Sequence, residues 1–399
     1  MSLSPVETTL IHHPDPARLR ATVLAWCAIN TGTANLPGLA AQAAALADAF
    51  AALPGELALH DPAPVTRIAA DGSAVEQPHG RHLVLRVRPQ AQTRVLLTGH
   101  MDTVFPADHP FQSARWLDDA TLNAPGAADM KGGLAVLLAG LAAFETTQPR
   151  LGYDVLVNAD EETGSLSSAA LLATLASGKA AALTYEPALP DGGMARARPG
   201  SGNFSAIVTG KAAHAGRNPH DGRNAVLAAA DLALRLAALA HAGLTVNPAK
   251  IDGGGPNNVV PAHAVLRFNL RPATPADETA ARVAIDRCVA AVAAAHDVAI
   301  HLHGHFNRPP KPVAPATSRL YELVRAAAAD LGQPLAWADT GGVCDGNNIA
   351  ALGVPVLDTM GALGGAIHSA DEFLCVDSLA PRAALTALVL HRLDMGELP

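Results

Sequence analysis

Apolar runs of two kinds alternate along the first half of the chain. Short runs rich in β-forming residues predict buried strands, and longer runs with apolar residues three and four positions apart predict helices. Strands that alternate with helices indicate an α/β fold with a largely parallel sheet. We expect the strands at 82–88 and 94–99 to pair with each other. The other predicted elements are strands at 154–158 and 181–185, and helices at 17–53 (two, joined by a turn), 129–144 and 165–175.

The pattern changes near residue 195. Strands and helices then follow in the order β-α-β-β-α-β, at 204–209, 223–242, 244–251, 264–271, 277–296 and 299–303. This order is that of the ferredoxin-like (split βαβ) motif and predicts one compact inserted domain. Apolar and polar residues alternate within 264–271, so one face of this sheet should pack on helices and the other should be polar.

The proline-rich segment Arg308–Pro312 predicts a stiff return from the inserted domain. A helix at 318–331, a strand at 354–358 and a helical segment from Asp377 then complete the first domain. The predicted division of the chain is therefore a first domain built from 1–195 and 308–399, interrupted by a second domain at 196–307.

Composition narrows the class of protein. The 399 residues are 49% hydrophobic and carry a net charge of −8 without a Lys/Arg run, which argues against nucleic acid as a partner. The four cysteines are scattered without CxxC spacing, as reduced thiols of an intracellular protein are. Met1–Pro16 lacks the pattern of a signal peptide, and the apolar run Leu134–Phe144 is too short to span a bilayer. We expect a soluble, cytoplasmic protein with no membrane partner.

Histidine and carboxylate side chains follow the predicted strands of the first domain. They are His100, Asp102, Asp129, Glu161, Glu162 and Glu186, with His368 shortly after the last strand. Each has a plain structural alternative: a Glu pair often begins a helix, and an aspartate such as Asp129 often caps one. Together, however, they fall where active sites of open α/β sheets lie, outside the carboxyl ends of the strands.

Several carboxylates at one sheet edge would repel each other, and doubly charged metal ions relieve that repulsion. Histidine and carboxylate ligands without a thiolate suit hydrolytic Zn²⁺, with Co²⁺ or Mn²⁺ as alternatives. Two histidines with several carboxylates fit two ions about 3.5–4 Å apart that share a bridging carboxylate. Because neighbours in an extended segment point in opposite directions, one of Glu161 and Glu162 can bind metal while the other faces the attacking water as a general base.

Four motifs carry a resemblance to a known family: Gly99–Val104, Asp129–Gly133, Asp160–Ser165 and Gly210–Gly216. With them the chain resembles, colinearly from about residue 94 to His368, the di-zinc metallopeptidases that include bacterial glutamate carboxypeptidases, acetylornithine deacetylases, succinyl-diaminopimelate desuccinylases and aminoacylases. The resemblance implies a catalytic domain with a mixed, largely parallel sheet and helices on both faces. It also implies that the inserted domain is a lid that mediates dimerisation.

The resemblance assigns roles to individual residues. It implies that Asp129 bridges two Zn²⁺ ions, that His100 and Glu186 hold one of them, and that Glu162 and His368 hold the other. Asp102 would orient His100, and Glu161 would be the base. The peptide bond after Asp129 is expected to be cis. His214 would reach the partner subunit's active site in a homodimer and stabilise the oxyanion, and the substrate carboxylate would be bound by Asn258, Arg271 and Arg308.

Two departures leave the substrate side chain open. The lysine that glutamate carboxypeptidases place after the Glu-Pro ligand segment has no clear counterpart, although Arg196 and Arg198 lie near. The loop from Gly341 contains the pair Asn347-Asn348 where small or aromatic residues are expected. Cys344 invites a thiol-nucleophile interpretation, but no motif supplies it with a histidine.

The expected function is zinc-dependent hydrolysis of the amide bond of an N-acyl or N-peptidyl amino acid, as in glutamate carboxypeptidases. The alternatives are an N-deacylase like acetylornithine deacetylase and a metal-binding homologue that has lost catalysis.

Overall fold

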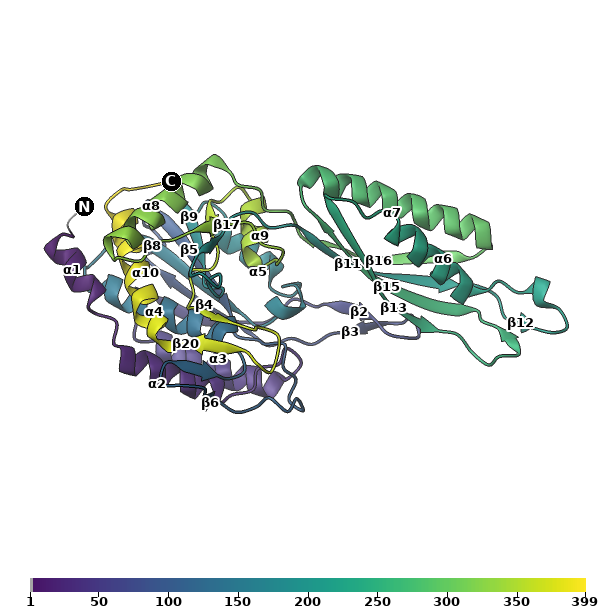
Figure 1. The fold of residues 1–399 in the computed structure, drawn as a ribbon, viewed down its shortest axis with the longest axis horizontal. Helices are drawn as coiled ribbons and strands as arrows, with labels where there is room; N and C mark the ends of the chain where they lie inside the picture. The colour runs from purple at the N-terminus through teal and green to yellow at the C-terminus, as the bar shows by residue number, and fades with distance from the viewer. Residues whose placement is uncertain (1–2) are drawn as a thin grey trace.

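The computed structural model describes residues 3–399, in which a six-stranded sheet organises the first of two units (Figure 1). Its strand order is β1 (Glu56–His60), β4 (His82–Val87), β8 (Gly152–Asn158), β5 (Arg94–His100), β9 (Ala181–Thr184) and β18 (Val356–Leu357). The pairs β8–β5, β5–β9 and β9–β18 are parallel, whereas β1–β4 and β4–β8 are antiparallel. The sheet is therefore mixed and largely parallel, as predicted.

The predicted pairing of 82–88 with 94–99 is wrong, because β8 lies between β4 and β5 and pairs with both. All seven residues of β8 are buried. A strand with no exposed residue belongs inside a sheet with neighbours on both sides. A continuous apolar run does not encode which strand lies beside it, so sequence adjacency was a poor guide here.

Helices cover both faces of this sheet. Val95 and Leu97 of β5 pack into the larger core, and Leu96 between them packs into a smaller core on the other face. The larger core is formed with α2 (Pro16–Cys27), α3 (Leu36–Phe50), α4 (Gly132–Glu145), α8 (Pro315–Asp330) and α10 (Leu379–Asp394), and the smaller core with α5 (Ala169–Ala176) and α9 (Asp345–Ala351).

Helix α4 and the turn before it, Ala127–Glu145, form the one stretch of the described residues that is long and apolar enough to cross a membrane. Of its most apolar window, 83% is buried inside the protein. Helices of this kind are common in the cores of globular proteins, where an all-round apolar surface is needed.

The second unit has the predicted β-α-β-β-α-β order and its own hydrophobic core. Its antiparallel sheet has the order β13-β15-β11-β16, and α6 and α7 cover one face (Figure 1). On β15, Leu266 and Phe268 are buried, while Arg267 and Asn269 lie on the more open, polar face, as the alternation predicted. The elements are β11 (Ser201–Thr209), α6 (Ala225–Ala237), β13 (Leu244–Gly253), β15 (His263–Pro272), α7 (Pro275–His296) and β16 (Ala299–Arg308).

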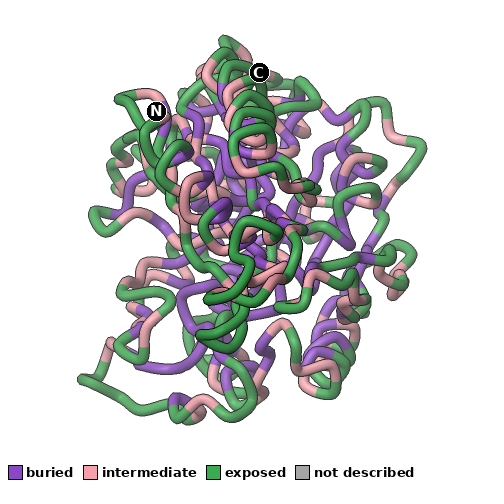
Figure 2. The backbone as a smooth tube through the Cα atoms, turned by 90° about the vertical axis from the view of Figure 1, so that its right-hand side faces the viewer, coloured by how far each residue is buried: buried purple, intermediate pink, exposed green. Residues whose placement is uncertain are grey.

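We propose to keep the domain boundaries at 196 and 307, with 1–195 and 308–399 as the catalytic domain, because the second core draws on this segment alone. Residues 1–2 of that division lie outside the described residues. Figure 2 shows buried stretches gathered inside the molecule and exposed loops around them. We call the second unit the lid.

Several short elements were not predicted. The hairpin of β2 (Thr66–Ile68) and β3 (Ala74–Glu76) reaches the lid, where Arg267 Nη2 donates to the carbonyl oxygen of Ile68 at 2.9 Å. A small sheet of β6 (Arg115–Trp116), β7 (Thr121–Asn123), β19 (Gly364–Gly365) and β20 (Phe373–Cys375) lies beside the segment that carries His368. The remaining helix of regular length is α1 (Pro5–Ile11), and a short strand pair joins β10 (Met194–Ala195) to β17 (Trp337–Ala338).

Candidate metal centre and active site

The strands of the parallel part of the sheet end close together. His100 is the last residue of β5, Glu161 and Glu162 form a 3₁₀ turn shortly after β8, and Glu186 follows β9. Because β8, β5 and β9 are parallel neighbours, their carboxyl ends deliver these side chains to one edge. Asp129 reaches the same edge from the turn before α4.

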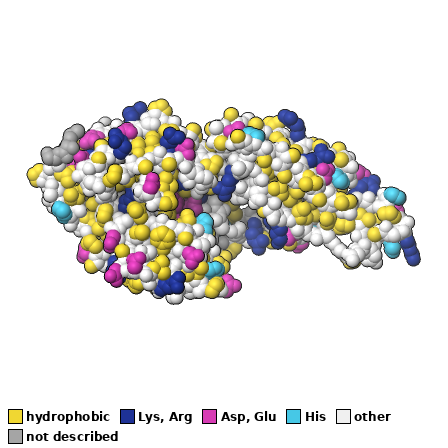
Figure 3. All heavy atoms as spheres, in the orientation of Figure 1, with side chains coloured by type: hydrophobic (Ala, Val, Ile, Leu, Met, Phe, Trp, Pro, Cys, Tyr) yellow, Lys and Arg dark blue, Asp and Glu magenta, His cyan; other side chains and the backbone are white. Residues whose placement is uncertain are grey.

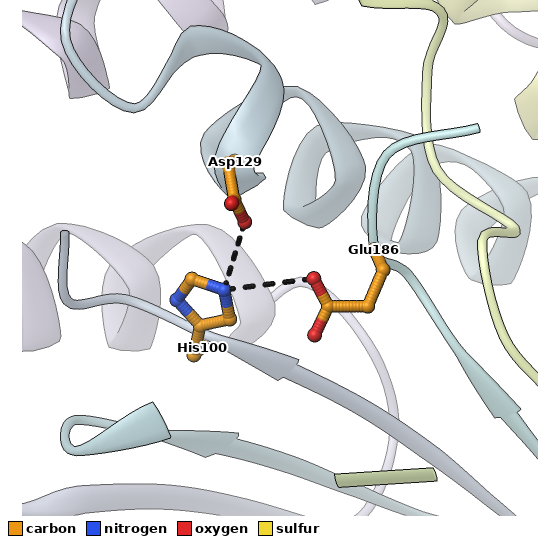
Figure 4. A group of neighbouring side chains, drawn as sticks. All are labelled: His100, Asp129 and Glu186. Atoms are coloured by element: carbon orange, nitrogen blue, oxygen red, sulfur yellow. Dashed lines mark hydrogen bonds and ion pairs between the residues drawn. The ribbon is translucent and has the colours of Figure 1, made fainter. Parts of the chain in front are cut away.

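One group of side chains comprises His100, Asp129 and Glu186, which point toward one another in Figure 4. Nε2 of His100 lies 3.1 Å from Asp129 Oδ1 and 3.8 Å from Glu186 Oε2. The candidate donor atoms all lie within 4.8 Å of one another. A nitrogen and two carboxylate oxygens at this spacing can converge on one divalent cation.

A second group shares Asp129 with the first and adds Glu162 and His368. Nε2 of His368 lies 3.3 Å from Asp129 Oδ2 and 3.2 Å from Glu162 Oε2. Asp129 thus turns one carboxylate oxygen to each group, which is the arrangement of a bridging carboxylate. Its peptide bond to Met130 is cis, as the resemblance implied. His368 has a φ of 63°, a left-handed conformation that non-glycine residues seldom adopt.

Asp102 lies under both groups and is fully buried. Nδ1 of His100 is 2.9 Å from the backbone carbonyl oxygen of Asp102 and 3.6 Å from its carboxylate. The carboxylate accepts hydrogen bonds from the backbone N–H groups of Glu161 (3.1 Å) and Glu162 (3.2 Å), and from the hydroxyl of Thr33 (2.8 Å). Asp102 therefore positions the Glu161–Glu162 turn with its side chain and His100 chiefly with its backbone.

The charges at this edge are strongly coupled. Burial lowers the pKa of His100, but its contacts with Asp129 and Glu186 outweigh burial and raise the pKa well above its usual value. Contacts with Asp129 and Glu162 raise the pKa of His368 to about 10. Burial raises the pKa of Glu186, with His100 opposing the shift. Three carboxylates around two imidazoles form a site rich in negative charge, and this set of nitrogen and oxygen donors suits Zn²⁺, Co²⁺ or Mn²⁺.

Glu161 belongs to neither ligand group and faces Arg308. Nη2 of Arg308 donates to Glu161 Oε1 at 2.7 Å, and its Nη1 pairs with Asp345 and donates to Asn348 Oδ1 at 2.8 Å. Burial raises the pKa of Glu161 well above its usual value, and Arg308 opposes that shift. A carboxylate beside the metal ligands with a raised pKa is suited to accept and return a proton.

A cavity of about 950 Å³ opens from these side chains toward the lid, and Figure 3 shows the molecule hollowed between its two units. Arg271 lines it from β15 and donates to the carbonyl oxygen of Gly341 at 3.1 Å. Arg308 also lines it, although its guanidinium group is already engaged by Glu161 and Asp345. Further polar lining residues are Arg198, Asn203, Asn247, Asn269 and Asn307.

His214 and Asn258 do not join this site within one chain; neither is among the residues of 3–399 that line the cavity. Both are exposed at the far end of the lid, where β12 (Ala213–His214) pairs with β14 (Val259–Val260) (Figure 1). We call this end the lid tip. Nδ1 of His214 accepts from the backbone N–H groups of Gly216 (3.1 Å) and Arg217 (3.2 Å). In the neutral imidazole the proton then sits on Nε2, which is left as an outward donor.

Cys344 lies beside the cavity but is only 2% exposed. Burial raises the pKa of its thiol well above the usual value, although Arg198 opposes the shift. A nucleophilic cysteine needs a lowered pKa, so the thiol-nucleophile interpretation has no support here.

The sequence reasoning missed three residues that hold this site in place. Asp345 pairs with Arg308, Thr33 binds Asp102, and Glu372 binds the backbone around Asp129. Asp345 lies in the loop from Gly341, which departs from the family pattern at Asn347-Asn348. Neither Thr33 nor Glu372 stands in a quoted motif, and no local pattern reveals its partner.

Comparisons with known proteins identify the family of the chain. The sequence pattern of peptidase family M20/M25/M40 matches residues 96–392. Carboxypeptidase G2 of Pseudomonas sp. (strain RS-16) is 29% identical over 346 residues, covering 84% of this chain and 81% of that protein. Succinyl-diaminopimelate desuccinylase of Maricaulis maris is 30% identical over 329 residues, covering 76% of this chain and 82% of that protein.

Solved structures share the fold at lower identity. A tripeptidase from Staphylococcus aureus has a TM-score of 0.75 at 22% identity, covering 96% of this chain and 100% of that chain. An M20 family metallo-carboxypeptidase from Sulfolobus solfataricus has a TM-score of 0.72 at 15% identity, covering 94% and 99%. Family match, relatives and fold agree: the chain belongs to peptidase family M20/M25/M40, a family of metal-dependent hydrolases that act on amide bonds.

Proposed function

We propose that the protein is a zinc-dependent hydrolase that cleaves the amide bond of an N-acyl or N-peptidyl amino acid, in the manner of a glutamate carboxypeptidase. The observation that carries the proposal is the pair of donor groups that share Asp129. The similarity to carboxypeptidase G2 supports this choice of substrate class within the family.

In this proposal His100 and Glu186 would hold one Zn²⁺, Glu162 and His368 would hold the other, and Asp129 would serve both; Co²⁺ or Mn²⁺ would suit the same donors. When bound, the ions lower the pKa of water and polarise the substrate carbonyl. Glu161 takes a proton from the attacking water and passes it to the nitrogen of the leaving amine. Asp102 keeps Glu161 and Glu162 in place through the two backbone hydrogen bonds described above.

Arginine side chains of the cavity would bind the free carboxylate of the substrate. Arg271 on β15 and Arg308 at the end of β16 line the cavity, and a planar guanidinium group matches a carboxylate. Arg198 adds a further positive charge: it and Lys311 share the single buried carboxylate of Asp358. The one positive charge that Asp358 leaves unbalanced suits an anionic group of the substrate beside Arg198.

The role of His214 requires a second subunit, and we propose a homodimer in which His214 and Asn258 complete the partner's site. The lid supports this with an open strand edge at β13 and with apolar residues exposed on the adjacent helix α6. On that helix Leu227 is 59% and Leu234 is 73% exposed. Exposed leucines beside a free strand edge are typical of a surface that another chain covers. A soluble, cytoplasmic dimer is our proposal for its state in the cell.

An N-deacylase is the second candidate, because desuccinylases are among the relatives at 30% identity. Hydrolysis should be screened across N-acetyl, N-succinyl, N-formyl and peptidyl forms of glutamate, aspartate, ornithine and hydrophobic amino acids. Preference for peptidyl glutamate supports the carboxypeptidase. Preference for an acylated ornithine or other diamino acid supports the deacylase, and no turnover in the metal-loaded protein supports a catalytically silent homologue.

A further inference from the structure

Glu372 is a buried carboxylate that touches the backbone of the Asp129 turn. Its side chain is 1% exposed. Oε2 accepts a hydrogen bond from the N–H of Gly126 (3.2 Å), and Oε1 accepts from the N–H groups of Ala128 (3.0 Å) and Asp129 (3.1 Å). Both oxygens are therefore used, and all three donors belong to the turn that carries Asp129.

These amides need such a partner. They lie in the turn before α4, where the backbone of Asp129 and Met130 is not helical, and buried N–H groups outside regular hydrogen bonding need another acceptor. A negative charge at this end also interacts favourably with the helix dipole, and hydrogen bonds to a carboxylate are stronger than neutral ones. Lys131 holds the other side of the turn, where its ammonium group donates to the carbonyl oxygen of Ile29 at 2.8 Å.

The loop that carries Glu372 also carries His368, four residues earlier. The side-chain amide of Asn123 ties this loop to β7 by donating to the carbonyl oxygens of Ala370 (3.1 Å) and Glu372 (2.7 Å). This loop thus carries the candidate ligand His368, and its Glu372 also fixes the backbone of Asp129, the carboxylate that the two donor groups share.

We propose that Glu372 is a positioning residue that sets Asp129 against His368 and thereby sets the affinity of the site for divalent metal. It contacts backbone N–H groups and lies outside the substrate cavity lining. Its effect should therefore fall on metal affinity, with the binding of substrate to the loaded enzyme left intact. The inference rests on the metal centre proposed above.

The test compares Glu372→Gln with Glu372→Asp and with Asp371→Asn, a matched control at the exposed neighbouring acid. Glutamine offers one acceptor oxygen and turns an NH₂ donor toward backbone donors, while aspartate keeps the charge but shortens its reach. Affinity is measured by Co²⁺ titration, followed by visible absorption, and by competition between Zn²⁺ and a chelator. The melting temperature of the metal-free protein and the KM of the loaded enzyme are measured in parallel.

Glu372→Gln should weaken metal binding about 10-fold to 100-fold, the usual cost of losing a group that orients a ligand. KM at saturating metal should stay within about twofold of wild type, and Asp371→Asn should match wild type throughout. If Glu372→Gln fails to fold, Glu372→Asp carries the test with a smaller loss of affinity.

Unchanged metal affinity in Glu372→Gln would overturn the inference, as would a loss of affinity matched by unfolding of the metal-free protein in both variants. Failure of the proposed function is a different result: the wild-type protein itself would then bind no divalent metal.

Discussion

The sheet edge of the catalytic domain and the tip of the lid are built in opposite ways. At the sheet edge, His100, Asp102 and Asp129 are buried, and each contacts a partner fixed by a different strand or turn. At the lid tip, His214 is exposed on a two-residue strand, and Asn258 is exposed directly before the strand that pairs with it. The donor groups of the first region contact one another within one chain, whereas His214 and Asn258 are not among the described residues that line the cavity.

This difference indicates where each part of the chemistry is assembled. A buried cluster of charges is stable only when every group is paired, so it must be completed by the fold itself. An exposed donor costs little and can be offered to a partner that arrives later. Changes at the edge should therefore abolish chemistry or destabilise the fold, and changes at the tip should act through the dimer that we propose.

The largest effect should come from removing metal. Treatment with a strong chelator should reduce turnover to the uncatalysed level, because no ion then activates water or polarises the substrate carbonyl, and Zn²⁺ should restore it. The measurement is hydrolysis of a substrate found in the screen, before and after stripping and reloading. Full activity in the metal-free protein would contradict the proposed role of metal at the sheet edge.

Glu161→Gln should lower kcat about 10²–10⁴-fold, the usual contribution of a positioned acid–base group. Metal content should stay at the wild-type level, because Glu161 belongs to neither donor group. Turnover is followed together with metal analysis of the same sample. Retained turnover would remove Glu161 from the role of base.

His214→Ala should lower kcat about 10²–10³-fold, as the loss of one oxyanion donor does in other hydrolases. His220→Ala, another exposed lid histidine, is the matched control and should match wild type. The contrast separates loss of the donor at His214 from a general disturbance of the lid.

Mixing His214→Ala with Glu161→Ala subunits should restore about a quarter of wild-type activity, since half of the dimers are then mixed and each has one complete site. If mixed dimers form without any return of activity, His214 does not act across the interface and the lid tip needs another explanation.

Asp358→Asn should destabilise the fold by about 3–5 kcal/mol, because it leaves buried cations without their partner. Asp358 accepts from Arg198 at 2.6 Å and from Lys311 at 2.5 Å, and both cations are buried. Asp297→Asn in the lid is the exposed control and should not measurably change the stability, since the pair of Asp297 with Arg223 is solvated. Denaturant unfolding of both variants measures the contrast, and equal stabilities would contradict it.

The same carboxylate predicts a small pH effect. Burial raises the pKa of Asp358, but Lys311 and Arg198 outweigh it and lower the pKa to about 2. Its pKa in the unfolded chain is about 3.9. The contribution to stability is therefore present above about pH 4 and is lost as the pH falls toward 2. The free energy of unfolding of the wild type should decrease by this contribution as the pH falls through this window, and that of Asp358→Asn should not.

Much of this organisation was predictable from sequence because it follows local rules. The helices at 17–53, the β-α-β-β-α-β order and the alternation along 264–271 all reflect apolar periodicity, and the structure contains them. The gathering of His100 with Glu186 follows from parallel strands that end at one edge. The resemblance to the family assigned a role to each candidate ligand, and these metal-binding roles stay a prediction.

What could not be predicted depends on partners far apart in the chain. The central position of β8 depends on neighbours that an unbroken apolar run does not name. Arg308 was expected to bind substrate, and no local signal showed that Asp345 and Glu161 already engage it. Glu372 binds backbone N–H groups, which every residue except proline carries, so its partners leave no mark in the sequence.

Anomalous diffraction at the zinc absorption edge, from crystals of the zinc-loaded protein, tests the central claim most directly. The account predicts two peaks about 3.5–4 Å apart with Asp129 between them, one beside His100 and Glu186 and the other beside Glu162 and His368. A single peak, or peaks away from Asp129, would contradict the shared carboxylate on which the proposed chemistry depends.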